Sequence, residues 1–136
     1  MAARDPRESV PITVELFVPD VAAGVRFYTE KLGFELLRLE RGAIDGREQA
    51  TFAVVGLERA AFLIAHEGLE GGLTLPPSGG AIDIRIMVED VDAVYRRARE
   101  GAVEIVNDIA DRDYGLRDFI LRDPNGFRLR FASAVR

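Results

Sequence analysis

The sequence predicts an α+β fold in which two βαβββ modules in tandem form an open, cavity-bearing eight-stranded sheet. Three observations support this fold. Residues 11–18 and 81–88 both alternate apolar and polar side chains in the manner of strands. Each segment is followed by a helical pattern and then by three further strand-like segments. The second copy lies 70 residues after the first, and one module alone cannot cover its own sheet.

The first module begins with the strand PITVELFV at 11–18, which Pro19 ends. Apolar residues then recur at helical spacing over 20–32. Asp20 is the predicted N-cap of this helix, and Gly33 is its predicted left-handed C-cap. Three strands are expected to complete the module, at 34–40, 47–55 and 59–66.

The second module repeats this order. The segment DIRIMVEDV at 83–91 aligns with TVELFVPDV at 13–21, so that Asp90 corresponds to Asp20. Asp90 is the predicted cap of a helix that runs through Glu100 and stops at Gly101. Three strands are again expected, at about 102–107, 116–122 and 127–132, the last two joined by a tight turn at 123–126.

The predicted domain organisation follows from these limits. Residues 1–10 show no periodicity and are expected to be a flexible tail. Residues 67–80 contain five Gly, two Pro and one Ser, which predicts a linker between the modules at 11–66 and 81–136. The two modules are expected to make one structural domain overall.

The composition excludes several classes of site. The 136 residues contain no Cys and a single His, His66, which excludes thiolate metal sites and sites that need two or three His from one chain. The net charge of −5 lacks the basic character of a nucleic-acid-binding protein. The N-terminus has no apolar signal region, and no apolar run is long enough to span a membrane. The expectation is a cytoplasmic protein with neither a nucleic-acid nor a membrane partner.

Two groups of motifs carry a resemblance to a known family. They are VPDVAAGVRFYTEKLGFEL in the first half, and VEDVDAVYRRARE with YGLRDFILRDPNGFRLRF in the second. Over about residues 11–132 the chain resembles the vicinal oxygen chelate superfamily, which includes glyoxalase I, extradiol dioxygenases, fosfomycin-modifying enzymes and bleomycin-resistance proteins. The Tyr114-Gly115 pair and the RDPNG turn look most like the bleomycin-resistance branch. That resemblance implies a homodimer that sequesters a ligand without chemistry.

The resemblance also implies where a metal would bind, on the first and last strand of each module. The corresponding positions here are Thr13, Leu63, Asp83 and Arg130. Only Asp83 is a metal ligand of normal strength, because Thr is weak, Leu is inert and Arg carries a fixed positive charge. We therefore expect no metal and no cofactor, and assign no catalytic residue.

Strand alternation gives candidate ligand-binding residues independently of the family. The faces opposite the helices carry polar and aromatic side chains, and Tyr114 and Phe119 are expected to add to the apolar wall. With the position of Leu63 included, the candidates are Thr13, Glu15, Phe17, Leu63, Asp83, Arg85, Met87, Tyr114, Phe119 and Arg130. Two interpretations stay open. Glu15 and Asp83 could pair with Arg85 and Arg130 in a structural cluster between the modules, or these charges could form the polar part of a pocket. Asp111 to Asp113 are expected in a solvated turn.

The sequence favours a metal-independent protein that binds an unknown small organic molecule. The alternative is a glyoxalase- or dioxygenase-like enzyme, either with a divergent metal site using Glu15, Asp83 and His66, or with metal-free acid–base chemistry. The acidic balance of the chain favours a cationic ligand weakly, whereas Arg85 and Arg130 favour a carboxylate or phosphate.

Overall fold

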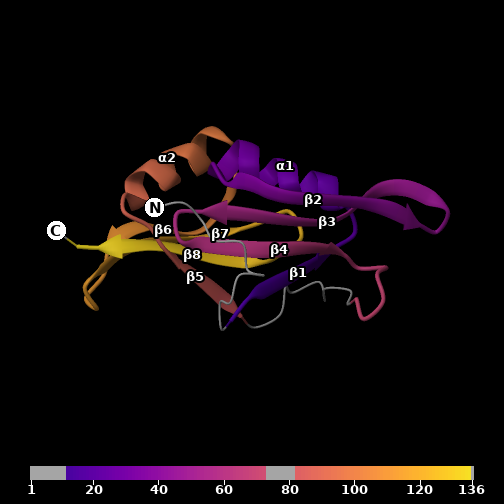
Figure 1. The fold of residues 1–136 in the computed structure, drawn as a ribbon. Helices are drawn as coiled ribbons and strands as arrows, with labels where there is room; N and C mark the ends of the chain where they lie inside the picture. Colours follow the sequence, from indigo (N-terminus) through magenta and orange to yellow (C-terminus); the bar gives the residue numbers. More distant parts are fainter. Residues whose placement is uncertain (1–11, 73–81, 136) are drawn as a thin grey trace. The chain divides into compact units, whose positions relative to one another are not determined.

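The computed structural model describes residues 12–72 and 82–135. The predicted tail at 1–10 and most of the predicted linker at 67–80 lie outside the described residues. The chain divides into two compact units, Met1–Leu75 and Pro76–Arg136, so the division falls within the segment predicted as a linker. Each unit contains one strand, one helical segment and three further strands (Figure 1).

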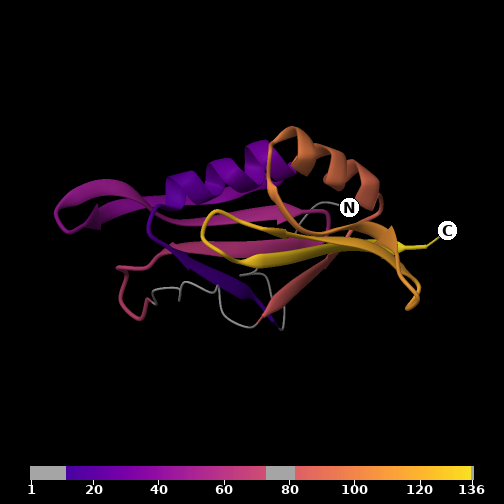
Figure 2. The ribbon, with the colours of Figure 1, turned by 180° about the vertical axis from the view of Figure 1, so that it is seen from behind.

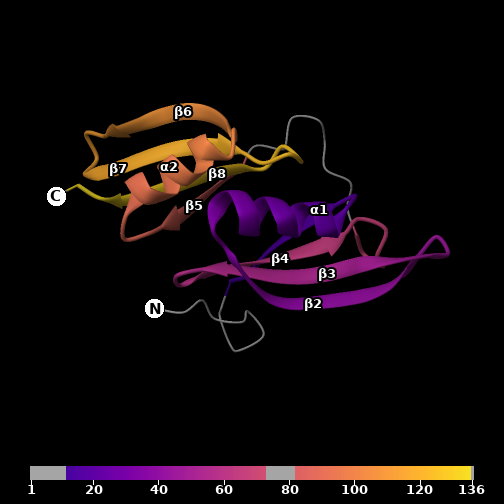
Figure 3. The same ribbon diagram turned by 90° about the horizontal axis from the view of Figure 1, so that it is seen from above.

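The first unit is a four-stranded mixed sheet with a helical segment on one face. Its strands are β1 (Val14–Val18), β2 (Glu35–Ile44), β3 (Arg47–Leu57) and β4 (Ala60–His66). They are ordered β1-β4-β3-β2, with β1 parallel to β4 and the other pairs antiparallel. Helix α1 (Val21–Arg26) packs on β3 and β4, and the view from above shows it lying along them (Figure 3).

The helix predicted at 20–32 begins as expected but changes its geometry midway. The Asp20 carboxylate accepts a hydrogen bond from the backbone N–H of Ala23, as an N-cap does. After Arg26 the chain continues as a π-helical turn, η1 (Phe27–Lys31). The wider turn buries the two consecutive rings of Phe27 and Tyr28. Gly33 follows with φ of 81°, the left-handed conformation predicted for it.

The second unit repeats this topology with strands β5 (Asp83–Met87), β6 (Glu104–Asp111), β7 (Leu116–Arg122) and β8 (Arg128–Ala134). They are ordered β5-β8-β7-β6. Helix α2 (Val91–Glu100) packs on β7 and β8, on one face of the sheet (Figure 2), and the Asp90 carboxylate caps it through the N–H of Ala93.

The end of α2 is confirmed, since the helix runs to Glu100 and Gly101 is its C-cap, with an ordinary φ of −80°. The left-handed residue is Ala102, with φ of 55°. The turn at 123–126 is confirmed, since the buried Asp123 carboxylate accepts hydrogen bonds from the N–H groups of Asn125 and Phe127.

The α+β class and the two βαβββ modules are confirmed, but the single eight-stranded sheet is not. The strands lie in two four-stranded sheets, one in each unit, with β1 paired to β4 in the first and β5 paired to β8 in the second. Neither helix in the described ranges has the length and apolar character needed to cross a membrane.

Candidate functional site

The open face of the second sheet, opposite α2, gathers charged side chains from β5 and β8. In the parallel ladder Asp83 lies beside Arg128, and Arg85 lies beside Arg130. Ile86 and Phe131 point to the other face and are buried. The alternation of the sequence therefore places Asp83, Arg85 and Arg130 on one face, as expected.

Asp83 is held between two guanidinium groups. Its Oδ2 accepts a hydrogen bond from Nη2 of Arg130 at 3.1 Å, and its Oδ1 lies 2.8 Å from Nε of Arg128. The second contact is an ion pair without a hydrogen bond, since the buried Nε of Arg128 has no acceptor in good alignment. The Asp83 side chain is 32% exposed, so water reaches this pair.

The centre of the face is a buried carboxylate, Asp118 on β7, whose residue is 0% exposed. Its oxygens accept hydrogen bonds from Nε of Arg112 at 2.8 Å, the hydroxyl of Tyr114 at 2.6 Å and Nη1 of Arg130 at 3.1 Å. Burial by itself raises the pKa of Asp118, but the hydrogen bonds from Tyr114, Arg112 and Arg130 outweigh it and hold that pKa below its ordinary value. Asp118 is therefore an ionised acceptor of three donors.

Tyr114 is held over this face by its hydroxyl. The turn that carries it closes when the N–H of Arg112 donates to the carbonyl of Leu116, with Gly115 at φ of 87°. The Tyr114 hydroxyl donates to Asp118 and accepts from Nη1 of Arg130 at 3.2 Å. The hydrogen bond to Asp118 raises the pKa of Tyr114. The residue is nevertheless 56% exposed, so its ring offers surface to a ligand.

These residues border a hollow of about 470 Å³, lined by Arg85, Tyr114, Leu116 and Arg130. That volume lies within the range of small-molecule sites. Arg130 is charge-paired with Asp83 and Asp118, whereas Arg85 is exposed and forms no ion pair with another described residue. Within the described ranges the hollow therefore presents one positive charge without an ionic partner, beside an aromatic ring.

The remaining candidates from the sequence do not line this hollow. Thr13, Glu15, Phe17 and Leu63 belong to the first unit. Glu15 is exposed on β1, and its expected proximity to Arg85 stays a prediction. Met87 is exposed on β5. Phe119 is fully buried in the core, where its ring stacks on Phe131 and meets Tyr95 edge-on.

Sequence reasoning missed three members of the cluster, Asp118, Arg112 and Arg128. Arg112 lies at the predicted turn, but its side chain is not solvated as expected, because its guanidinium binds Asp118 and the carbonyl of Asp108. A usable signal was present in the tight turn. It pairs Arg122 with Arg128, which places Ile120 beside Arg130 and Asp118 two pairs further along, opposite Ala132. Asp118 then shares a face with Arg130, since side chains two positions apart on a strand point the same way.

The residues at the family's metal-ligand positions do not fit a divalent cation. Both oxygens of Asp83 already contact guanidinium groups, and Arg130 places a permanent positive charge beside them. Thr13 offers only a weak hydroxyl ligand, and Leu63 offers no ligand atom. Among the described residues no three of His, Asp and Glu gather in a way that could hold a metal.

His66 does not supply the missing ligand. Its Nδ1 accepts a hydrogen bond from the N–H of Gly68 at 2.9 Å. In the neutral imidazole, Nε2 then carries the proton and has no lone pair for a metal.

A second hollow, of about 490 Å³, lies where α2 begins. Among the described residues its one lining cation is Arg117, which forms two hydrogen bonds with Asp92, at 2.9 and 3.0 Å, and one with Asp111. These bonds hold the pKa of Asp92 below its ordinary value. The cluster ties the start of α2 to β6 and β7, which is a structural task.

Two features define the class of this protein. One is an open mixed sheet with one helix, present twice in tandem, and the other is a polar face at the family's ligand positions. The family model for the Glyoxalase/Bleomycin resistance protein/Dioxygenase superfamily matches residues 11–131, and the chain belongs to that superfamily.

Solved structures with the same fold come from several members. TioX from Micromonospora sp. ML1 is 22% identical, with a TM-score of 0.75 over 93% of this chain and 100% of that one. A glyoxalase/bleomycin resistance protein/dioxygenase from Nocardioides is 22% identical, with a TM-score of 0.66 over 94% and 86%. The fosfomycin resistance protein FosX from Listeria monocytogenes is 15% identical, with a TM-score of 0.67 over 93% and 94%. No curated protein matches the chain.

Proposed function

We propose that this protein binds a small organic anion without metal, in the manner of the bleomycin-resistance branch, at the hollow lined by Arg85, Tyr114, Leu116 and Arg130. The observation that carries the proposal is the pair Arg85 and Arg130, adjacent in the β5–β8 ladder, with Arg85 lacking an ionic partner among the described residues. Like charges placed side by side on a sheet repel one another. A carboxylate or phosphate on the ligand removes that repulsion and accepts two sets of hydrogen bonds.

The lining also defines the rest of the ligand. Tyr114 and Leu116 offer an aromatic ring and an aliphatic side chain beside the two guanidinium groups. A planar apolar body can stack on the Tyr114 ring while its acidic group reaches Arg85. The ligand class is therefore an aromatic or other flat acid rather than a cation, even though the chain as a whole is acidic.

The first prediction concerns Arg85. We expect naphthalene-2-carboxylate to bind the wild-type protein, and Arg85→Gln to weaken that binding about 10-fold, because a hydrogen bond to a charged group is lost. Isothermal titration calorimetry measures the two affinities. The neutral naphthalene-2-carboxamide should bind both proteins weakly and equally.

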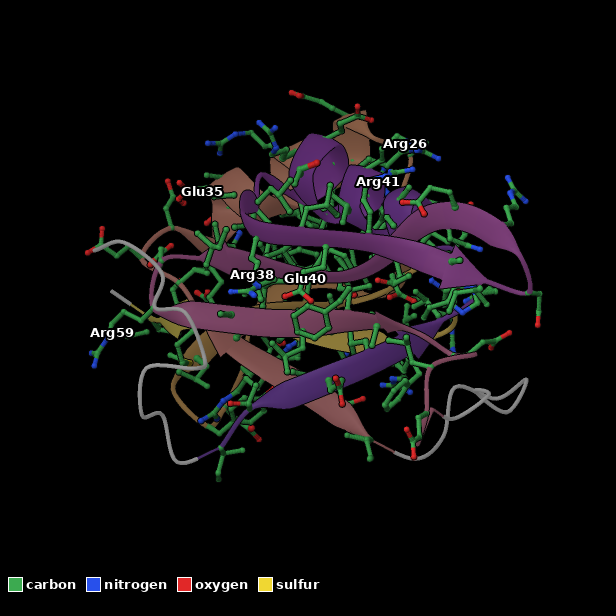
Figure 4. All side chains as sticks on the ribbon, turned by 45° about the vertical axis from the view of Figure 1, so that its right-hand side comes forward. Arg26, Glu35, Arg38, Glu40, Arg41 and Arg59 are labelled. Atoms are coloured by element: carbon green, nitrogen blue, oxygen red, sulfur yellow. The ribbon has the colours of Figure 1, made fainter. Side chains whose placement is uncertain are left out.

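Arg59→Gln is the matched control, since it also removes one exposed positive charge. Arg59 lies at the turn between β3 and β4 and points away from the sheet (Figure 4). If Arg59→Gln weakens binding as much as Arg85→Gln, the effect is long-range and the proposed site is wrong. Recovery of the carboxylate unchanged after prolonged incubation distinguishes binding from turnover.

The second prediction concerns metal. We expect protein prepared with zinc, nickel, manganese and iron present to retain far less than one equivalent of any of them, because Arg130 occupies a ligand position. Elemental analysis measures the content, and the melting temperature should not change with EDTA. Near-stoichiometric metal that EDTA removes with loss of stability would contradict this prediction and show that the protein holds a structural metal ion.

The homodimer implied by the resemblance is also part of this proposal. Each sheet has exposed apolar residues on an edge strand, Leu36 and Leu39 on β2 and Val106 on β6. Pairing of two copies would cover such edges.

A further inference from the structure

Arg130 divides its donors between two carboxylates of different character. Nη1 faces Asp118 and the Tyr114 hydroxyl, and Nη2 faces Asp83. Asp118 is 0% exposed and receives three hydrogen bonds from side chains. Asp83 is about one-third exposed and receives one hydrogen bond, together with an ion pair whose angle is poor. Asp118 is thus fixed, and Asp83 is the partner that Arg130 can release.

We propose that Asp83 competes with the acidic group of the ligand for Arg130. The Asp83 carboxylate occupies Nη2 of Arg130 until an anionic ligand takes its place. The proposal rests on the proposed function, because it concerns the same hollow. An incoming carboxylate would bind Nη2 of Arg130 together with Arg85, while Asp83 stays paired with Arg128. Asp118 and Tyr114 keep Nη1 and hold the Arg130 side chain in position throughout.

This arrangement makes Asp83 a specificity-determining residue. Exchange of one carboxylate for another at Arg130 is close to neutral in charge, so an acid gains little from Arg130 alone. Affinity must then come from Arg85 and from the apolar body, which selects flat acids over simple inorganic anions. A ligand without an acidic group cannot displace Asp83 and gains nothing from either arginine.

The test is the affinity of Asp83→Asn for naphthalene-2-carboxylate, measured by calorimetry at neutral pH. Removing the competitor frees Nη2 of Arg130, so we expect binding to tighten about 5-fold, the equivalent of a partly exposed ion pair. Naphthalene-2-carboxamide should bind the variant and the wild type equally. Glu100→Gln, at the exposed end of α2, removes one negative charge elsewhere and should leave both affinities unchanged.

A second variant tests the same competition with the opposite sign and keeps the proposal falsifiable if Asp83→Asn does not fold. Arg128→Gln removes the other partner of Asp83, which leaves Asp83 to Arg130 alone. We expect the carboxylate to bind this variant about 3-fold more weakly. If Asp83 has a purely structural role, these variants should instead lose stability, and their affinities for the carboxylate and the carboxamide should not change differently.

The outcomes distinguish the two proposals. If neither the wild type nor Asp83→Asn binds the carboxylate, the proposed function itself fails. If the wild type binds it through Arg85 but Asp83→Asn binds it no tighter, only the competition is wrong. Binding detected in Asp83→Asn alone supports the competition.

Discussion

Asp118→Asn is expected to lower the free energy of unfolding by about 3 kcal/mol, the range found when one partner of a buried ion pair is removed. The carboxylate is 0% exposed, and the side chains of Arg112 and Arg130 are only 22% and 24% exposed. The asparagine amide keeps one acceptor oxygen but places N–H donors where the second oxygen accepts, and it removes the negative charge that two partly buried guanidinium groups share. Urea denaturation at pH 7 measures the loss.

Asp111→Asn is the matched control for that substitution. Its carboxylate is 60% exposed and bonds only Arg117, which keeps Asp92 as a partner. We expect a loss below about 1 kcal/mol, as for exposed ion pairs. Equal losses for Asp111→Asn and Asp118→Asn would mean that burial gives Asp118 no special weight.

The stability conferred by Asp118 should depend on pH in a defined direction. Burial raises the folded-state pKa of Asp118, but the three hydrogen bonds lower it by more, so the net shift is downward. A lowered pKa contributes stability that is complete above the ordinary carboxyl value of about 3.9. That contribution is lost as the pH falls from there through the folded pKa. The difference in free energy of unfolding between the wild type and Asp118→Asn should therefore be constant from pH 7 to 5 and become smaller near pH 3.

The repeat and the alternation of side chains were enough to predict the modules and the face that carries Asp83, Arg85 and Arg130. They could not predict which charges pair, because pairing depends on register across strands that are distant in sequence. The sequence pattern offered Glu15 and Asp83 as partners of these arginines, and the ion pair between Asp83 and Arg130 is present. Within the second unit the structure adds Asp118 as a partner of Arg130, from a strand whose pattern is otherwise largely apolar.

The π-helical turn at Phe27–Lys31 shows a different limit of sequence reasoning. Helical spacing at 3.6 residues per turn predicts one buried ring per turn. Here Phe27 and Tyr28 are both buried, and Tyr28 packs against Phe34 and Phe62. The π-helical turn and the burial of two consecutive rings thus occur together, and the spacing of apolar residues along the sequence predicts neither of them.

Arg130→Ala should reveal both roles of the residue at once. We expect it to lower the free energy of unfolding by about 2 kcal/mol, less than Asp118→Asn, because every group it leaves behind keeps a partner. Asp118 retains Arg112 and Tyr114, and Asp83 retains Arg128. Binding of naphthalene-2-carboxylate should weaken about 3-fold, less than for Arg85→Gln, because Arg130 exchanges Asp83 for the carboxylate of the ligand and so adds little net affinity.

Arg112→Ala is the control that separates the two roles of Arg130. Arg112 and Arg130 each donate to Asp118, but only Arg130 lines the hollow. The two alanine variants should therefore lose similar stability in urea denaturation, whereas only Arg130→Ala should lose affinity for the carboxylate. A stability change below about 1 kcal/mol for Arg130→Ala would show that its ion pairs behave as exposed ones. Equal losses of affinity would show that the Asp118 network, and not contact with Arg130, controls access of an anion to the hollow.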